Sequence, residues 1–303
     1  MKWIRPAVSI LLLALLFKLV DLNEVIGNLL AIPTGFLAVA LLLFSLSVVV
    51  SVYKWKVCLP AAHFRTLFRS YLTSLFLFLL PTGTLGAEIS KLAVARSDRI
   101  PLPAVAASIA LDKLTGLAAL ALVGSVAGFL ATIPYAKSAA AVLLLAALAA
   151  MAMVIAAGPF SDFGAPWRAR GGVVRRKLLS LTASIAEIGA RPGLIWRSLA
   201  IGIVAQGVMV AIYACLATGL GLTYPLPELV LCVVIANLVS ILPITLGGLG
   251  VRELGLVALL AELGIGADAS TALALAVFGI FLVGAAAGFV NQLVPEASPT
   301  SDA

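Results

Sequence analysis

The chain has 303 residues, of which 63% are hydrophobic and only 11% charged, and its mean hydropathy is +1.19. A water-soluble domain cannot expose so much apolar surface, so this composition argues against a soluble globular protein. Repeated apolar runs near the spanning length of about 20 residues predict an all-α, polytopic membrane protein. The net charge of +7 comes from bases that fall mostly in loops, as the positive-inside rule describes, so no nucleic-acid partner is expected.

Histidine and cysteine are too sparse for most catalytic or metal sites. His63 is the only histidine, and the three cysteines (Cys58, Cys215 and Cys232) are widely spaced. Two of these cysteines lie in apolar runs as small packing residues, so no disulfide framework or metal spacing is present. The sequence also lacks a GxxxxGK phosphate loop and a nucleophile elbow. We therefore expect no enzyme, no metal site and no cofactor.

The N-terminal stretch, residues 1–20, begins with two bases and continues as an apolar run that resembles a signal peptide. No small-x-small cleavage site follows, so we predict an uncleaved first helix with a cytoplasmic N-terminus. Asp21 and Glu24 mark an outer loop. Residues 32–53 are predicted to span the membrane, and a basic cytoplasmic loop follows over residues 54–69.

A short apolar segment, Tyr71 to Leu80, ends at Pro81 and is too short to span a membrane. A polar stretch, Glu88 to Arg99, follows it, so we predict a re-entrant hairpin that enters from the cytoplasm and returns there. Broken backbone at membrane depth is tolerated only where protein buries it or where it lines a wet cavity. An interfacial helix before the hairpin is also predicted from four apolar residues at helical spacing: Leu67, Phe68, Tyr71 and Leu72.

The next long apolar segment, residues 104–133, carries Asp112 and Lys113 in its first third. Adjacent residues on a helix point about 100° apart, so these two are not expected to pair with each other. We expect one of them to face the first hairpin and the other to snorkel. Residues 139–157 are predicted to span back.

The longest polar loop, residues 158–197, contains seven bases and is predicted to be cytoplasmic. Within it, residues 174–190 have an amphipathic pattern and are predicted to lie on the membrane surface. Binding of anionic lipid is one interpretation of this pattern. A solvated loop that only sets the topology is the alternative, and we favour it.

A second broken segment repeats the order of the first. Residues 198–220 span outward, and the apolar run over residues 229–242 is again half-length and ends at Pro243. Pro243 disrupts a helix, and glycines allow backbone shapes that other residues resist. Because only acids follow, at Glu262 and Asp268, this hairpin is predicted to enter from outside and return there. Its break contains three glycines and an adjacent pair of charges: Gly247, Gly248, Gly250, Arg252 and Glu253.

The last predicted span, residues 271–290, contains a small-xxx-small face from Gly284 to Gly288, which indicates close helix packing. The membrane domain is thus predicted over residues 1–294, and residues 295–303 form a disordered cytoplasmic tail. Sixteen of the 20 Lys and Arg fall on the predicted cytoplasmic side, which supports about six spans with both termini inside. The two hairpins then lie on opposite sides of the membrane, the pattern of an inverted repeat.

Three motifs stand out: Leu80-Pro81-Thr82-Gly83 with Gly86-Ala87-Glu88 and Lys91; Leu111 to Gly116; and, most specific, Pro243 to Glu253 followed by Gly264. In these motifs nearly the whole chain resembles the membrane region of lysylphosphatidylglycerol synthases, a flippase-like family. The resemblance implies a multi-pass protein of the bacterial cytoplasmic (inner) membrane. It also implies movement of polar lipids between leaflets, among them aminoacylated phosphatidylglycerol and, by proposal, polyprenyl-linked sugars and hopanoid-related lipids.

The chain departs from this family in three respects. Family members often have Gly-Asp and a later Arg in the first motif, where this chain has Ala87-Glu88 and Lys91. The basic residue often seen in the last helix is missing, and Val277 and Phe278 occupy that area. No soluble aminoacyl-transfer domain follows the last predicted helix, so we expect no lipid-aminoacylating activity.

With no catalytic or metal site expected, the remaining candidate is a polar binding site within the membrane. A cation, the N-terminal dipoles of half-helices and free backbone N–H groups lower the barrier for carrying a lipid phosphate through hydrocarbon. Arg252 is the natural phosphate partner, because a guanidinium binds phosphate through two parallel hydrogen bonds. Glu253 and Glu88 would balance it, select a cationic headgroup or carry a coupling proton. Asp112 and Lys113 would complete the inner side.

We therefore predict a lipid translocase whose ligands are membrane lipids with phosphate-bearing or aminoacylated headgroups. Two alternatives stay open: the charges only pair with one another and hold the hairpins, or the chain is a non-transporting scaffold subunit of a lipid or glycan biosynthesis complex. The sequence leaves the oligomeric state open, a homodimer included. The predicted site residues are Pro81, Glu88, Lys91, Asp112, Lys113, Pro243, Gly247, Gly248, Gly250, Arg252 and Glu253.

Overall fold

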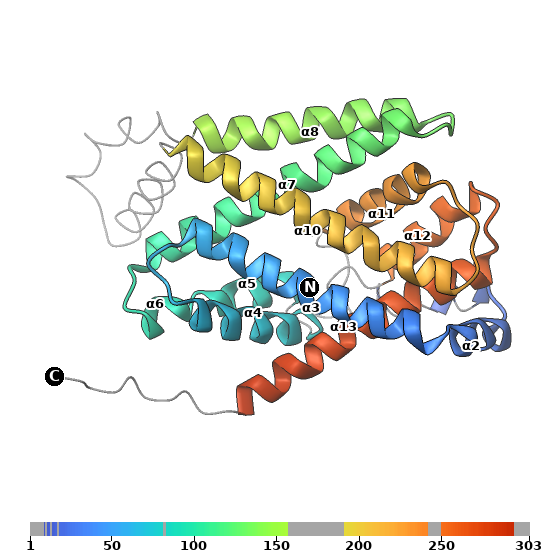
Figure 1. The fold of residues 1–303 in the computed structure, drawn as a ribbon, viewed down its shortest axis with the longest axis horizontal. Coiled ribbons are helices and arrows are strands. Elements are labelled where there is room, and N and C mark those ends of the chain that lie inside the picture. Colours follow the sequence, from blue (N-terminus) through green and yellow to red (C-terminus); the bar gives the residue numbers. More distant parts are fainter. Residues whose placement is uncertain are drawn as a thin grey trace.

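The computed structural model describes residues 18–80, 83–156, 191–241 and 250–293, together with residues 9, 11, 12 and 14–16. Between residues 22 and 293 the described ranges form eleven α-helices and contain no strand. Five of them are long and apolar enough to cross a membrane and lie along the length of the molecule (Figure 1): α3 (Thr34–Cys58), α7 (Leu102–Leu130), α8 (Ala136–Ala156), α10 (Pro192–Gly219) and α13 (Ala267–Leu293). The prediction of an all-α polytopic membrane protein is thus confirmed.

These five helices correspond to five of the six predicted spans, with ends that differ by a few residues. The sixth, residues 1–20, lies largely outside the described residues. So do the predicted surface segment over residues 174–190 and the predicted tail, residues 295–303.

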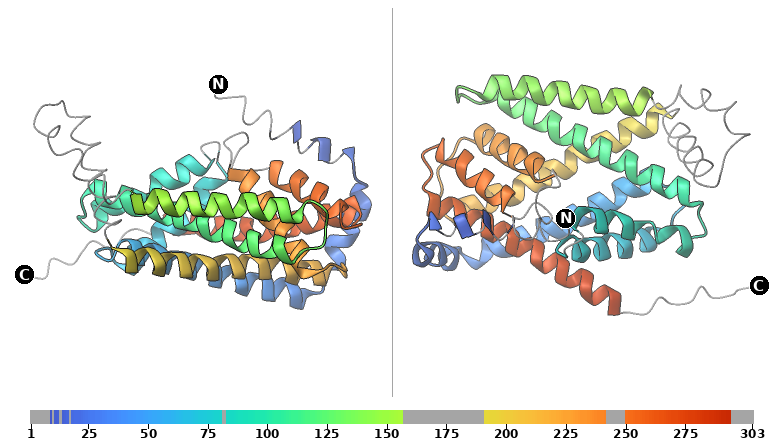
Figure 2. Two further views of the ribbon diagram at one scale, coloured as in Figure 1. Left: turned by 90° about the horizontal axis from the view of Figure 1, so that it is seen from above. Right: turned by 180° about the vertical axis from the view of Figure 1, so that it is seen from behind.

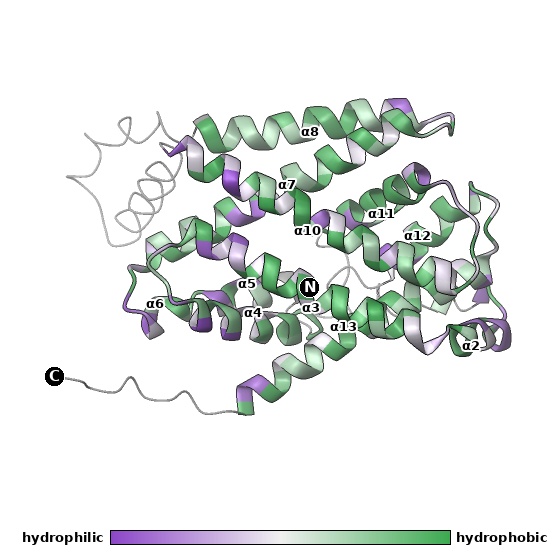
Figure 3. Cartoon of the chain, in the orientation of Figure 1, coloured by the Kyte–Doolittle hydropathy of each residue, from purple (hydrophilic) through white to green (hydrophobic). Residues whose placement is uncertain are grey.

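The long helices consist mostly of apolar residues, as the hydropathy colouring in Figure 3 shows, and many of their large hydrophobic side chains are exposed. On α8, for example, Val142 and Leu145 are 65% and 67% exposed. Exposing such side chains to water would be unfavourable, but exposing them to lipid is not, because lipid tails are as apolar as leucine. The exterior is therefore built to contact hydrocarbon.

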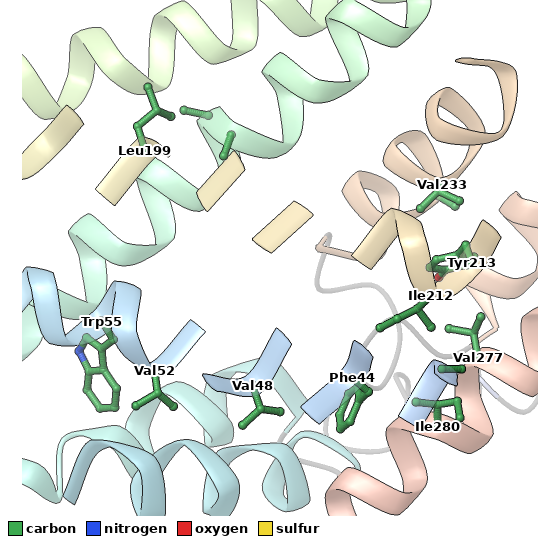
Figure 4. Packing of buried hydrophobic residues seen from close by; sticks show 14 of the residues in the cluster. Phe44, Val48, Val52, Trp55, Leu199, Ile212, Tyr213, Val233, Val277 and Ile280 are labelled. Carbon is green, nitrogen blue, oxygen red and sulfur yellow. The ribbon is translucent and has the colours of Figure 1, made fainter. Parts of the chain in front are cut away.

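The interior is organised around one face of α3. Phe44, Val48 and Val52 recur every fourth residue and are all buried, which is the spacing of one helical face. They belong to the same buried cluster as Ile212 of α10 and Val277 of α13 (Figure 4). This apolar seam joins three of the long helices into one bundle.

The shorter helices form two groups at opposite ends of the molecule (Figures 1 and 2). One group contains α4 (Phe64–Phe78), α5 (Gly83–Lys91) and the single turn α6 (Val94–Ser97), and the other contains α11 (Leu226–Ile241) and α12 (Val251–Ala261). Within these groups α4 packs against α5 and α11 packs against α12, and their identity as re-entrant hairpins stays a prediction. Their entry into the membrane from opposite sides stays a prediction.

The turns within both helix pairs lie outside the described residues. The structure therefore does not place four of the predicted site positions: Pro81, Pro243, Gly247 and Gly248.

Two segments near the short helices differ from the prediction. The predicted interfacial helix and the half-helix after it are one continuous helix, α4, which packs along α13. The predicted outer loop at Asp21 and Glu24 opens a helix, α2 (Leu22–Ala31), because the Asp21 carboxylate accepts a hydrogen bond from the Asn23 N–H at 2.8 Å. Asp21 is thus an N-cap, and Glu24 lies in the first turn, where an acid suits the helix dipole.

Glycines bring α13 against its neighbours, as the small-xxx-small face predicted. A Cβ at Gly288 would lie 2.1 Å from the Leu72 carbonyl oxygen of α4, and a Cβ at Gly284 would lie 2.4 Å from the Phe44 ring of α3. Both distances are too short for a side chain, so only glycine allows this approach.

Candidate functional site

A cavity of about 330 Å³ lies among α3, α4, α5, α7 and α10, with Ile241 of α11 and Phe281 of α13 at its wall. This volume is at the small end of the range typical of ligand pockets. The cavity carries an unusual density of polar groups for the interior of a membrane protein. Its described polar and charged lining residues are Ser51, Lys54, Tyr71, Ser74, Glu88, Lys91, Asp112, Lys113 and Gln206.

Lys54 and Asp112 form the deepest ion pair of this cavity. The Lys54 ammonium lies 2.8 Å from Asp112 Oδ1 and also donates to the Asp112 backbone carbonyl, and only 6% of the Lys54 side chain is exposed. Lys54 was predicted to begin a cytoplasmic loop, and this was wrong. Helix α3 continues through Cys58, and the carboxylate on α7 gives the ammonium a partner within the protein.

Two glycines leave the space that the Lys54 side chain occupies. A Cβ at Gly116 of α7 would lie 3.4 Å from the Lys54 Nζ, and one at Gly202 of α10 would lie 3.2 Å from its Cε. Gly116 belongs to the motif that follows Asp112 in the sequence. This motif therefore supplies both the anion for Lys54 and part of the slot that holds it.

Glu88 of α5 bridges the other two lysines. Its Oε1 lies 2.7 Å from the Lys113 Nζ, and both carboxylate oxygens lie 3.3 Å from the Lys91 Nζ. Lys113 therefore faces the first helix pair, as predicted for one member of its motif. The expectation that the other member snorkels was wrong, because Asp112 is held by Lys54.

Lys91 is also enclosed by aromatic rings. Its ammonium lies 5.4 Å from the centroid of the Trp55 ring and 5.2 Å from that of Tyr71. The ring face is electron-rich, so it attracts a desolvated cation. Trp55 is fixed in turn by a 3.1 Å hydrogen bond from its Nε1 to the Ser108 Oγ. The two aromatic rings thus stabilise the Lys91 ammonium in addition to Glu88.

The five charged groups together leave one positive charge in excess when all are ionised. Lys54, Lys91 and Lys113 supply three ammonium groups against the carboxylates of Glu88 and Asp112. Charges inside a membrane protein are costly and usually mark a pathway or binding site. The excess favours an anion within the cavity.

Arg252 and Glu253 form a separate pair at the start of α12. The Arg252 guanidinium donates to Glu253 Oε1 from Nε (3.1 Å) and Nη2 (2.8 Å), and it lies 5.2 Å from the Phe281 ring. Glu253 Oε2 accepts the N–H of Gly250 at 2.8 Å, and Gly250 has a φ of 87°. A positive φ favours glycine, as the sequence predicted for this break.

The described lining of the cavity does not include Arg252 or Glu253. Phe281 lies between the two charged sites, because it contacts Arg252 and also lines the cavity. The structure thus brings together four predicted site residues, Glu88, Lys91, Asp112 and Lys113. It adds Lys54, which the sequence reasoning missed.

A signal for Lys54 was present in the sequence. Ser47, Ser51 and Lys54 follow one another at intervals of four and three residues, the spacing of one helical face. A polar stripe that ends in a lysine and continues an apolar span indicates a helix face toward a polar interior. The positive-inside rule, by contrast, places a base at the end of an apolar run in a loop, so the two signals conflict at Lys54.

Long lipid-facing helices around a charged interior cavity define a polytopic membrane protein with an internal polar site. A sequence model of the family described as "Lysylphosphatidylglycerol synthase TM region" matches residues 2–288. The chain belongs to this family. No curated protein and no solved structure shows a significant match to the chain.

Proposed function

We propose that this protein is a lipid translocase, which moves a phosphate-bearing lipid between the two leaflets of the bacterial cytoplasmic membrane. The observation that carries the proposal is the cavity bounded by Lys54, Glu88, Lys91, Asp112 and Lys113 inside an otherwise apolar bundle. Its ion pairs offer a headgroup the polar partners that hydrocarbon lacks. The family supports a membrane role and leaves the lipid open.

The cavity is suited to binding and passage rather than to covalent chemistry. A lipid headgroup crosses slowly because its charge must leave water for a medium of low dielectric constant. Ammonium groups that are already desolvated and held in place lower this cost for a phosphate, since charge-assisted hydrogen bonds replace its hydration. Acyl chains can stay in the lipid that surrounds the bundle. We therefore propose a non-enzymatic transporter with both termini in the cytoplasm.

Leaflet exchange in reconstituted vesicles tests this function. Purified protein in liposomes with a trace of fluorescent phosphatidylglycerol should make nearly all of the label reachable by a membrane-impermeant quencher. Protein-free vesicles should expose only the outer half. Equal quenching in both preparations, with the protein shown to be inserted and folded, would argue against translocation.

A scaffold subunit of a lipid or glycan biosynthesis complex is the second candidate. The observation in its favour is that Arg252 is bound on two of its nitrogens by Glu253 and covered by Phe281. Under this candidate the pair stabilises the start of α12 and has no part in transport. A scaffold would show no leaflet exchange by itself, so the vesicle experiment separates the two candidates.

A further inference from the structure

Glu88 occupies the position that a bound anion would take. One carboxylate contacts two ammonium groups from different helices, at 2.7 Å from Lys113 and 3.3 Å from Lys91. The Glu88 side chain is 24% exposed and that of Lys113 is 54% exposed, so this end of the cavity is reachable. The other carboxylate, on Asp112, is committed to Lys54 by a 2.8 Å ion pair that is more buried than the contacts of Glu88 with Lys113.

Lys91 has contacts that do not involve Glu88, because its ammonium also lies on the rings of Trp55 and Tyr71. The Lys113 side chain lines the cavity and is 54% exposed, so a second anion can reach it. A pair of ammonium groups that remains positioned when its carboxylate leaves is a ready site for another oxyanion. A phosphodiester carries two charged oxygens, as a carboxylate does, and each can accept a charge-assisted hydrogen bond from an ammonium group.

We propose that Glu88 is an internal stand-in for the substrate's anion, and that the phosphodiester of a lipid headgroup displaces it from Lys91 and Lys113. The inference rests on the proposed function and names the ligand chemistry of the same cavity. Displacement breaks the two contacts of the Glu88 carboxylate and forms phosphate contacts to the same two ammonium groups. No covalent bond changes.

The charge of the cavity then selects among headgroups. Three ammonium groups and two carboxylates leave one positive charge, which a phosphodiester with no other charge neutralises. A zwitterionic headgroup leaves that charge uncompensated, and a lysylated headgroup, with two amines and one phosphate, increases it. Because uncompensated charge is costly at low dielectric constant, the cavity favours lipids of the phosphatidylglycerol type over lipids that carry an amine.

The Glu88→Gln variant distinguishes displacement from a purely structural role of Glu88, because the two predict opposite changes in the affinity for anionic lipid. Glu88→Gln removes the internal competitor and leaves both lysines free for phosphate, so anionic lipid should bind more tightly. If Glu88 instead serves only to hold Lys91 and Lys113 in place, the same change should disorder the site and weaken binding. Lys113→Gln should weaken binding under the displacement mechanism, because it removes half of the phosphate site.

The experiment is calorimetric titration of the full chain, purified in a neutral detergent, with short-chain dihexanoyl phosphatidylglycerol. A matched titration with dihexanoyl phosphatidylethanolamine tests the effect of the headgroup charge. A titration with inorganic phosphate tests whether the lipid part of the ligand contributes to binding. The variants are Glu88→Gln, Glu88→Asp and Lys113→Gln, with Glu262→Gln as a control at an exposed acid outside the cavity. Thermal unfolding without lipid verifies that each variant is folded.

We expect Glu88→Gln to lower the Kd for phosphatidylglycerol about tenfold, or about 1.4 kcal/mol, and Lys113→Gln to raise it by a similar factor. Glu88→Asp and Glu262→Gln should stay near the wild type, and phosphatidylethanolamine should bind more weakly. Weaker or unchanged phosphatidylglycerol binding in folded Glu88→Gln would overturn displacement. Equal binding of the two lipids would overturn the charge selection, and binding of phosphate alone would overturn a lipid ligand.

Failure of this inference is distinct from failure of the proposed function. Leaflet exchange by the wild type together with weakened binding in Glu88→Gln would leave translocation standing and refute displacement. Tightened binding in Glu88→Gln without leaflet exchange would establish the anion site and refute translocation.

Discussion

The ion pair between Lys54 and Asp112 is the residue-scale feature with the clearest energetic consequence. Asp112→Asn removes the anion from an ammonium whose side chain is only 6% exposed. An uncompensated buried charge costs about 3–5 kcal/mol, so the variant should unfold at a clearly lower temperature in detergent.

The double variant Lys54→Met with Asp112→Leu is the matched control for this prediction. It removes both charges and keeps apolar volume, so it should recover most of the lost thermal stability. An Asp112→Asn variant as stable as the wild type would show that Lys54 has another anion or is not buried in the membrane.

The charged residues differ in how far the sequence alone could place them. Glu88, Lys91 and Lys113 could be assigned to an interior site, because a charged side chain next to apolar membrane helices needs a polar partner within the protein or contact with water. Lys54 is ambiguous, because its spacing from Ser47 and Ser51 favours an interior helix face, whereas a lysine after an apolar run also fits the positive-inside rule. Which carboxylate pairs with which lysine depends on the contact between α3 and α7, and spacing along one helix does not contain that information.

At the scale of elements, the long helices were predictable because their length and composition are set by the hydrocarbon thickness. The ends of these helices were harder to predict. Helix α3 continues past the predicted boundary because Lys54 forms an ion pair with Asp112 inside the protein. The segment before Pro81 forms one helix, α4, which α13 approaches closely at Gly288. Only the cap at Asp21, with Glu24 three residues on, was a local signal that could have predicted α2.

Gly288→Ala tests the contact between α13 and α4. The added methyl group would meet the Leu72 carbonyl oxygen at 2.1 Å, so α13 must move and the variant should lose about 1–3 kcal/mol of stability. Unfolding in detergent by heat or denaturant measures this loss.

Gly279→Ala on the same helix is the control, because nothing lies within 4 Å of its Cβ position. It should be neutral or slightly stabilising, since alanine favours helix by about 1 kcal/mol over glycine. Equal effects of the two variants would refute the close packing of α13 on α4.

At the scale of the whole molecule, the two groups of short helices lie at opposite ends of the bundle (Figure 2). If the membrane lies across the long helices, exposed positions at these ends face opposite compartments. Ser97 and Glu262 are both exposed, after the first helix pair and after the second.

Single cysteines at Ser97 and Glu262, introduced after replacement of the three native cysteines, should react with an impermeant thiol reagent from opposite sides. The positive-inside rule predicts that Ser97→Cys reacts from the cytoplasm and Glu262→Cys from outside. Reaction of both positions from the same side would contradict the opposed arrangement in the membrane.

The central claim is that a lipid headgroup crosses the membrane through the charged cavity. Leaflet exchange measured on two matched lysine variants tests it most directly: Lys113→Gln within the cavity and Lys137→Gln, an exposed lysine outside its lining. Lys113 is half-exposed and Glu88 keeps Lys91 as a partner, so Lys113→Gln should remain folded. The account predicts that Lys113→Gln slows exchange of phosphatidylglycerol by about tenfold or more, since one charge-assisted hydrogen bond is worth about 1.5–3 kcal/mol, while Lys137→Gln exchanges at the wild-type rate. Wild-type exchange by folded Lys113→Gln would contradict a route through this cavity.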